Sequence, residues 1–179
     1  MMLSDDGFTL LEILIVVVII GILAAISVPI YATFRIRSFE AAALSDLDTV
    51  RKAQFSLSVD ARQFGQSTNV GAAVVLLGNG VVLQGPGAIN DGLANLSSFV
   101  QISASNGVGF VTNTDPIGSS FTVTTKHVLG AKIFAYDNDI DNVRYVDNAT
   151  NVTLAVSGVS PASVRVADNI PFAGGWRIY

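Results

Sequence analysis

The sequence predicts an α+β protein in which one long N-terminal helix packs against an antiparallel, β-rich C-terminal domain. Residues 13–26 form an apolar run without any charged side chain. No proline or glycine occurs from residue 31 to residue 63, and charged residues enter this stretch at helical spacing. Beyond Gly65, short β-favouring runs alternate with turn residues. Together these three observations predict one helix of unusual length followed by a sheet.

The apolar segment 8–30 is long enough to cross a membrane. As a helix it spans roughly 35 Å at about 1.5 Å per residue, whereas the hydrocarbon core of a bilayer is about 30 Å thick. Glu12 is the only ionisable residue of this segment. A carboxylate inside a membrane helix costs roughly 2.5–3.5 kcal/mol, so we expect Glu12 to have a cationic partner. Cleavage between Gly7 and Phe8 would create one, a free α-amino group.

A GFTLLE box at residues 7–12 opens the apolar run, which contains Gly21 and ends near Pro29. This arrangement resembles the N-terminal segment of type IV pilins and of the related type II secretion pseudopilins. The resemblance implies a leader, residues 1–7, that prepilin peptidase removes, and a methylated amine on Phe8. It also implies that Glu12 pairs with the Phe8 amine of an adjacent subunit during assembly. An ordinary signal anchor with a stray Glu fits less well, because the cleavage glycine, the aromatic residue, the acid and the apolar run all occur in the order of the pilin segment. A secretory signal peptide fits worse still, because the run is too long and no small-x-small cleavage site follows it.

The charges around the apolar segment conflict with this orientation. The leader carries Asp5 and Asp6 and no basic residue, whereas Arg35 and Arg37 follow the segment. The tendency of basic residues to stay in the cytoplasm therefore predicts the opposite orientation. We give more weight to the cleavage box, because the tendency is statistical and the leader is short.

The helix is expected to extend over residues 8–64, about 55 residues and roughly 80 Å. Pro29 removes one backbone hydrogen bond and should bend the helix without ending it, and Gly21 is a second weak point. Phe64-Gly65 is the predicted end. The second half is amphipathic, with a predicted apolar stripe of Tyr31, Phe34, Ala41, Leu44, Leu47 and Phe55.

Residues 65–179 form the predicted β-rich head. The predicted strands are 74–77, 81–83, 99–102, 108–112, 121–126, 131–136, 143–146, 152–156 and 164–166. Asn79-Gly80 indicates a hairpin between the first two, with a short helix as the competing interpretation of 74–77. Residues 121–125 alternate apolar and polar side chains, which predicts a strand with one buried face.

The head contains one candidate metal site. Asp137, Asp139 and Asp141 place carboxylates at alternate positions, as in the opening of a calcium loop. An EF-hand would have glycine and glutamate where this chain has Asn142 and Asn148, so any calcium site here is a looser oxygen cage. A solvated acidic turn is the alternative interpretation. The surrounding stretch, Lys126-His127 and IFAYDNDI at 133–140, resembles the head of pilins from metal-reducing deltaproteobacteria.

Composition argues against several function classes. The chain has no cysteine, so packing, hydrogen bonds or a metal must hold the C-terminal region that many type IV pilins close with a disulfide. A net charge of −4 and scattered basic residues argue against a nucleic-acid groove. His127 is the only histidine, expected to be structural or exposed, and no catalytic motif accompanies it, so we expect no enzyme. We expect packing rather than electron transfer from the aromatic residues along the helix, which are Phe8, Tyr31, Phe34, Phe39, Phe55 and Phe64.

The combined expectation is a structural subunit of a type IV pilus. The precursor is stored in the inner membrane, and an assembly platform in that membrane polymerises it into an extracellular helical filament of identical subunits. A type II secretion pseudopilin is the alternative within the family. A membrane-anchored, calcium-binding surface domain that never polymerises is the alternative from another class. Motility, adhesion, DNA uptake and electron transfer all remain open as roles of the filament.

Overall fold

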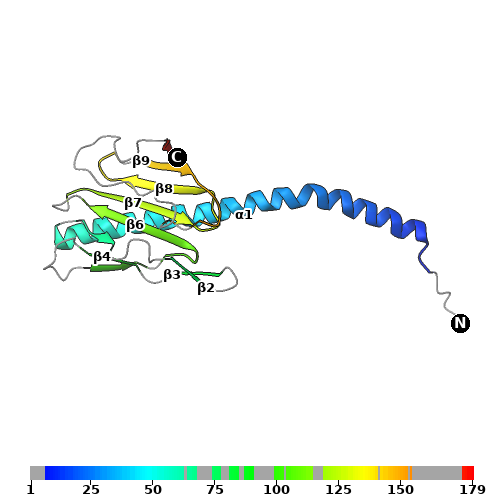
Figure 1. The fold of residues 1–179 in the computed structure, drawn as a ribbon, viewed down its shortest axis with the longest axis horizontal. Coiled ribbons are helices and arrows are strands. Elements are labelled where there is room, and N and C mark those ends of the chain that lie inside the picture. The colour runs from blue at the N-terminus through cyan, green and yellow to red at the C-terminus, as the bar shows by residue number, and fades with distance from the viewer. Residues whose placement is uncertain are drawn as a thin grey trace. The chain divides into compact units, whose positions relative to one another are not determined.

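The computed structural model of the chain describes residues 7–62, 64–67, 74–77, 81–84, 87–90, 99–102, 104–114, 119–140, 142–152, 154 and 175–179. The chain divides into two compact units, Met1–Arg35 and Ile36–Tyr179. The first holds the apolar half of the long helix, and the second holds its other half together with the sheets (Figure 1). The predicted α+β class, a long helix packed against an antiparallel sheet, is confirmed.

Helix α1 spans Leu10–Ala61 without interruption and contains Pro29, as predicted. Its predicted end at Phe64-Gly65 is wrong, because the helix stops at Ala61. Arg62 adopts a left-handed backbone conformation with a φ of 58°, which ends a helix as glycine commonly does. Arginine is not a residue from which such a turn can be predicted.

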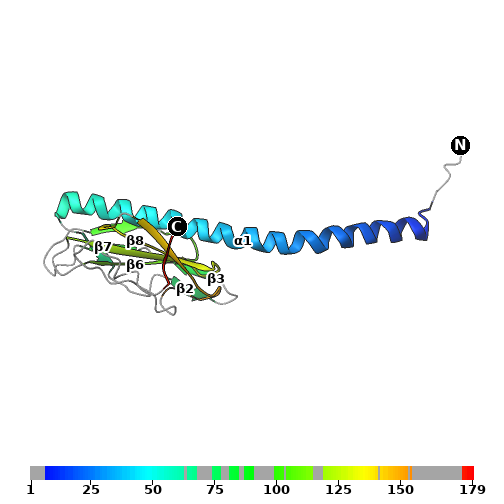
Figure 2. The same ribbon diagram turned by 90° about the horizontal axis from the view of Figure 1, so that it is seen from above.

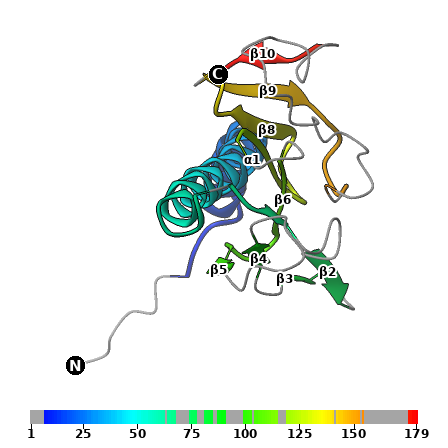
Figure 3. The same ribbon diagram turned by 90° about the vertical axis from the view of Figure 1, so that its left-hand side faces the viewer.

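The largest sheet in the described part of the chain is antiparallel, with the strand order β10-β9-β8-β7-β6 (Figure 3). Its strands are β6 (Val108–Thr114), β7 (Phe121–His127), β8 (Lys132–Asp137), β9 (Asn142–Asp147) and β10 (Arg177–Ile178). A smaller sheet joins β1 (Gln66–Ser67), β4 (Gly87–Asn90) and β5 (Phe99–Ile102), and β2 (Val74–Leu77) pairs with β3 (Val81–Gln84).

The strand predictions are confirmed for seven of these elements, β2, β3 and β5 to β9. The β2–β3 hairpin pairs Leu77 with Val81, which excludes the competing helix, while its Asn79-Gly80 turn lies outside the described residues. The predicted strand 152–156 is wrong where it can be compared, since neither Val152 nor Leu154 belongs to a strand. The predicted strand 164–166 lies outside the described residues. Strands β1, β4 and β10 are short, and none was predicted.

The core lies between the second half of α1 and one face of the large sheet (Figure 2). Its buried residues come from the helix (Ala43, Leu47, Val50, Leu57) and from strands (Ile102, Val108, Phe110, Phe121, Val123, Phe134, Tyr136). Each valine, leucine, isoleucine or phenylalanine among them contributes roughly 1.5–3 kcal/mol when fully buried.

The predicted apolar stripe of α1 is only partly correct. Leu47 is buried and Leu44 packs at the margin of the core, but Ala41 and Phe55 are exposed. The stripe that faces the sheet also includes Gln54, which is completely buried. A polar residue is stable there because Gly65 and Thr112 form hydrogen bonds with its amide group. The periodicity of apolar residues along the helix cannot reveal these partners.

Strand β7 is buried on both faces, so the prediction of one buried face is wrong. One face packs on α1. On the opposite side of the sheet a second apolar cluster joins Val111, Ile133 and Leu154, with Val146 and Trp176 packed against it. Leu154 and Trp176 come after β9 in the sequence, so the residue pattern of β7 itself cannot reveal an apolar cluster on that side of the sheet.

The C-terminal residues are held without a disulfide. The Tyr179 backbone N–H donates to the Val143 carbonyl at 3.0 Å, and the Tyr179 ring meets the Phe134 ring edge-on, with centroids 5.3 Å apart. The Arg177 guanidinium carbon lies 4.8 Å from the centre of the Tyr145 ring, and the same side chain forms an ion pair with Asp147. Hydrogen bonds and packing thus attach β10 to the sheet.

Candidate functional site

The start of α1 carries a reciprocal hydrogen-bond arrangement between Thr9 and Glu12. The Thr9 backbone N–H and hydroxyl donate to Glu12 Oε2 at 2.8 and 2.9 Å, and the Glu12 backbone N–H donates to Thr9 Oγ1 at 3.2 Å. Thr9 directly precedes the first helical residue, so the two form a capping box, which satisfies backbone donors that the helix itself leaves unpaired. The Thr-x-x-Glu spacing is a recognised signature of this arrangement, and the sequence-based interpretation of Glu12 missed it.

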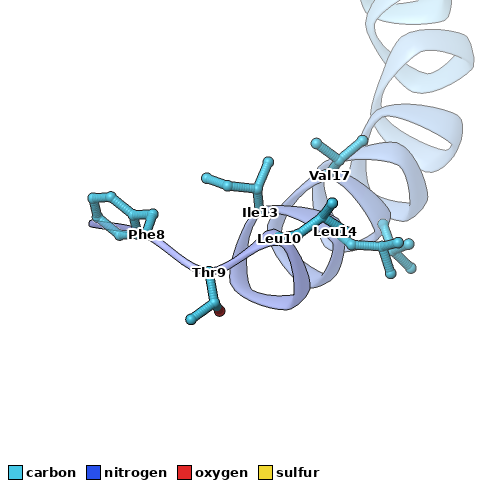
Figure 4. A pocket seen from close by; sticks show the side chains of 7 residues that line it. Phe8, Thr9, Leu10, Ile13, Leu14 and Val17 are labelled. Atoms are coloured by element: carbon cyan, nitrogen blue, oxygen red, sulfur yellow. The ribbon is translucent and has the colours of Figure 1, made fainter. Parts of the chain in front are cut away.

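The predicted cleavage junction, Gly7-Phe8, lies before the helix begins. Gly7 is exposed, and the Phe8 side chain is 83% exposed. Phe8 lines one end of a shallow apolar groove along the first turns of α1 (Figure 4). The other lining residues are Thr9, Leu10, Ile13, Leu14, Val17 and Val18. A peptide bond in non-helical, exposed backbone is accessible to a protease, although residues 1–6 lie outside the described part.

The first unit presents apolar side chains on every side of the helix. Every large apolar side chain from Phe8 to Ile30 is at least 49% exposed. By length and composition α1 could cross a membrane, and it is the one helix in the described part that could. A helix that is apolar all round is stable only when lipid or other protein surrounds it.

The predicted weak points, Gly21 and Pro29, both lie inside continuous helix. A Cβ added at Gly21 would meet nothing within 4 Å, so packing within the chain does not require glycine there. The Pro29 carbonyl accepts a hydrogen bond from Thr33 Oγ1 at 3.1 Å. Their role as a site of bending stays a prediction.

The candidate calcium site is only partly described, because Asp141 lies outside the described residues. Asp137 Oδ1 accepts the Asp139 backbone N–H at 2.9 Å, and Asn138 Oδ1 accepts the Phe121 backbone N–H at 2.7 Å. These contacts give both side chains a structural role in the turn after β8 without an ion. No group of three or more metal-ligating acidic, histidine or cysteine side chains gathers among the described residues. Calcium binding stays a prediction.

The aromatic residues of the head form a packed cluster. Phe64 lies 4.6 Å from Phe121 between ring centres, and Phe55 lies 5.8 Å from both. Tyr136 extends the cluster from Phe121 at 5.8 Å. Edge-on and tilted rings at such distances are the ordinary geometry of aromatic packing. The sequence did not reveal that Phe55, though partly exposed, joins helix and sheet in this way.

Comparison with known proteins finds similarity in the N-terminal segment of the chain. The prokaryotic N-terminal methylation motif matches residues 2–28. The type IV major pilin protein PilA of Myxococcus xanthus is 41% identical over 65 residues, which are 36% of this chain and 30% of that protein. The type IV major fimbrial protein FimA of Dichelobacter nodosus is 42% identical over 62 residues, 35% of this chain and 40% of that protein. A fimbrial protein of Pseudomonas aeruginosa is 38% identical over 66 residues, 37% of this chain and 43% of that protein.

The matched region thus covers less than half of the length of these relatives. No solved structure matches the chain. The relatives are pilus and fimbrial proteins by name and not enzymes, in agreement with the expectation from the sequence. The N-terminal part of this chain is therefore similar to that of type IV pilins.

Proposed function

We propose that the chain is a structural subunit of a type IV pilus. The observation that carries the proposal is an apolar helix whose side chains are exposed on all sides up to residue 30, which begins just after an accessible Gly7-Phe8 junction and lies largely within a methylation motif matched at residues 2–28. Such a helix needs an apolar surrounding at every stage. Lipid provides it for the precursor in the inner membrane, and the helices of other copies provide it in the filament.

Processing by prepilin peptidase precedes assembly in this proposal. Removal of residues 1–7 leaves Phe8 as the first residue, and its amine is then methylated. The new amine carries a positive charge close to the Glu12 carboxylate of a neighbouring copy. Since both groups lie in an apolar bundle, pairing them stabilises the one axial position at which each charge has a partner.

The head completes the subunit in the same proposal. It forms the outer surface of the filament, attached to the core by the second half of α1. Glycine and proline at Gly21 and Pro29 let the helix bend as the subunit leaves the membrane. An assembly platform in the inner membrane drives the transfer.

Electron microscopy of sheared surface material tests the proposal. Cells that express the full chain should yield long fibres, and an antibody against the head should label them along their length. A short structure confined to the periplasm would favour the pseudopilin. Labelled membranes without any fibre would favour an anchored surface domain and contradict the proposal.

A further inference from the structure

His127 joins three segments of the head at one corner of the core. Its ring is 5% exposed and stacks on Phe39 of α1, with ring centres 4.3 Å apart and planes 16° from parallel. The Leu129 backbone N–H, in the turn after β7, donates to His127 Nδ1 at 3.0 Å. Gly107, in the turn before β6, adopts a φ of +85°, and a Cβ there would lie 2.8 Å from Nε2. The ring therefore contacts the helix and both turns at once.

These contacts specify the neutral form of the imidazole. Because Nδ1 accepts a hydrogen bond, the single hydrogen of the neutral ring lies on Nε2. A protonated ring carries hydrogen on both nitrogens. Its Nδ1–H would then face the Leu129 N–H, and two donors cannot form a hydrogen bond with each other.

The charged groups around the ring already have partners. From α1, Glu40 pairs with Lys132 of β8 at 2.9 Å. Asp46 accepts the Ser105 backbone N–H and hydroxyl at 2.7 and 2.9 Å. From β7, Lys126 Nζ is buried and donates to the carbonyls of His127 and Gly130 at 3.2 and 2.9 Å. The turns 105–107 and 128–131 carry no ionisable side chain.

A charge on His127 is disfavoured in this corner. Burial lowers the pKa of His127, and the nearby Lys126 charge lowers it further, whereas the Asn106 hydrogen bond and the Asp46 charge oppose the change. A lowered pKa means that the unfolded chain binds the proton more tightly than the folded one. The stabilisation is therefore complete above the unfolded pKa of His127 and declines as the pH falls through its folded pKa.

We propose that His127 is a proton-sensitive joint of the head: protonation removes the Nδ1 acceptor of the Leu129 N–H and releases the turn 128–131 from the ring that stacks on α1. The turn 105–107 stays attached to α1, because Asp46 accepts two hydrogen bonds from Ser105 without the ring. The β6–β7–β8 pairing does not pass through the ring and stays formed. The joint depends only on the head, so it stands or falls independently of filament formation.

The proposal is testable because His127 is the only histidine of the chain. In the full chain in detergent micelles, without a histidine tag, the imidazole NMR signal reports protonation directly. Hydrogen exchange, corrected for the intrinsic effect of pH, reports opening of each segment. We expect several-fold faster exchange in peptides covering the turn 128–131 once the ring is protonated, and little change in those covering 105–107, 121–124 and 133–136.

Two variants separate the joint from general acid unfolding. His127→Gln cannot gain a charge in this range, so the change in exchange at the turn 128–131 should disappear. Lys126→Met leaves the ring intact and removes a neighbouring cation, so the pH of the imidazole titration and the pH of the exchange change should both rise. Exchange at this turn that does not follow the imidazole titration, or a change that persists at the same pH in either folded variant, would overturn the proposal.

Discussion

Two substitutions at the start of α1 separate two roles of Glu12. Its carboxylate takes part in the capping box with Thr9, and in the proposed filament it pairs with the Phe8 amine of a neighbouring copy. Glu12→Gln keeps an oxygen that can accept from Thr9, because glutamine also serves in capping boxes, but it removes the charge. Thr9→Val removes the hydroxyl that caps the helix and keeps the carboxylate.

The expected effects differ in size. Loss of an N-cap side chain costs roughly 0.5–2 kcal/mol of helix stability. Removing one partner of a buried ion pair costs about 3–5 kcal/mol, because the other charge stays buried and unpaired. Each 1.4 kcal/mol is about a tenfold change in an equilibrium constant, so the larger loss weakens the addition of each subunit by roughly 100-fold to 4,000-fold. It recurs at every subunit added.

Immunoblots of membrane and sheared fractions measure the outcome, in cells that lack any wild-type copy. Both variants should insert into the membrane and lose the leader, since the Gly7-Phe8 junction is intact. Thr9→Val should still build fibres in reduced amount, whereas Glu12→Gln and Glu12→Leu should build almost none. The reasoning fails if Glu12→Gln builds abundant fibres while Thr9→Val builds none, because Glu12 would then act through the helix cap alone.

Three further predictions concern the head and use the full chain in detergent. Gln54→Leu should lower the free energy of unfolding by roughly 2–6 kcal/mol, because the buried Gly65 N–H and carbonyl both lose their partner and each unsatisfied group costs about 1–3 kcal/mol. Urea titration followed by Trp176 fluorescence measures this loss, and a loss below about 1 kcal/mol would contradict the prediction. Burial lowers the pKa of Lys126 to about 8 from its ordinary value of 10.5, so the unfolded chain binds this proton more tightly than the folded chain. The free energy of unfolding should therefore rise as the pH increases from about 8 to 10.5, and the part of this rise that is due to Lys126 should be absent in Lys126→Met. If Asp137 and Asp139 hold calcium, a chelator should lower the melting temperature and Asp139→Ala should abolish the difference; identical melting curves would leave the acidic turn as the explanation.

The helix was predictable because its signals are local. A charge-free run, the absence of glycine and proline to residue 63, and helical spacing of charges all act within a few turns. The end was missed because Arg62 takes a left-handed conformation that glycine usually takes. The capping box was open to prediction from Thr9 and Glu12, because the Thr-x-x-Glu spacing is a local signature of it.

The sheet was predictable where strands are long and rich in β-branched residues, as in β7 and β8. It was not predictable where pairing depends on distant partners. Strand β10 forms because Arg177 pairs with Tyr145 of β9 and the Tyr179 ring packs on Phe134 of β8. Gln54 is buried because Gly65 and Thr112 offer it hydrogen-bond partners from other segments. Such positions reveal their role only once the chain has folded.

The site residues show the same division. Gly7, Phe8 and Glu12 follow from a short contiguous motif, and comparison places that motif in residues 2–28. The joint at His127 requires Phe39, Gly107 and Leu129, which come together from separate segments. No spacing within the sequence connects these residues.

The intact mass of the chain recovered from sheared fibres tests the central claim most directly. The account predicts fibres composed of a chain that begins at Phe8, with the mass of residues 1–7 absent and one methyl group added. A chain in those fibres that retains Met1 to Gly7, or fibres from which this chain is missing, would contradict it.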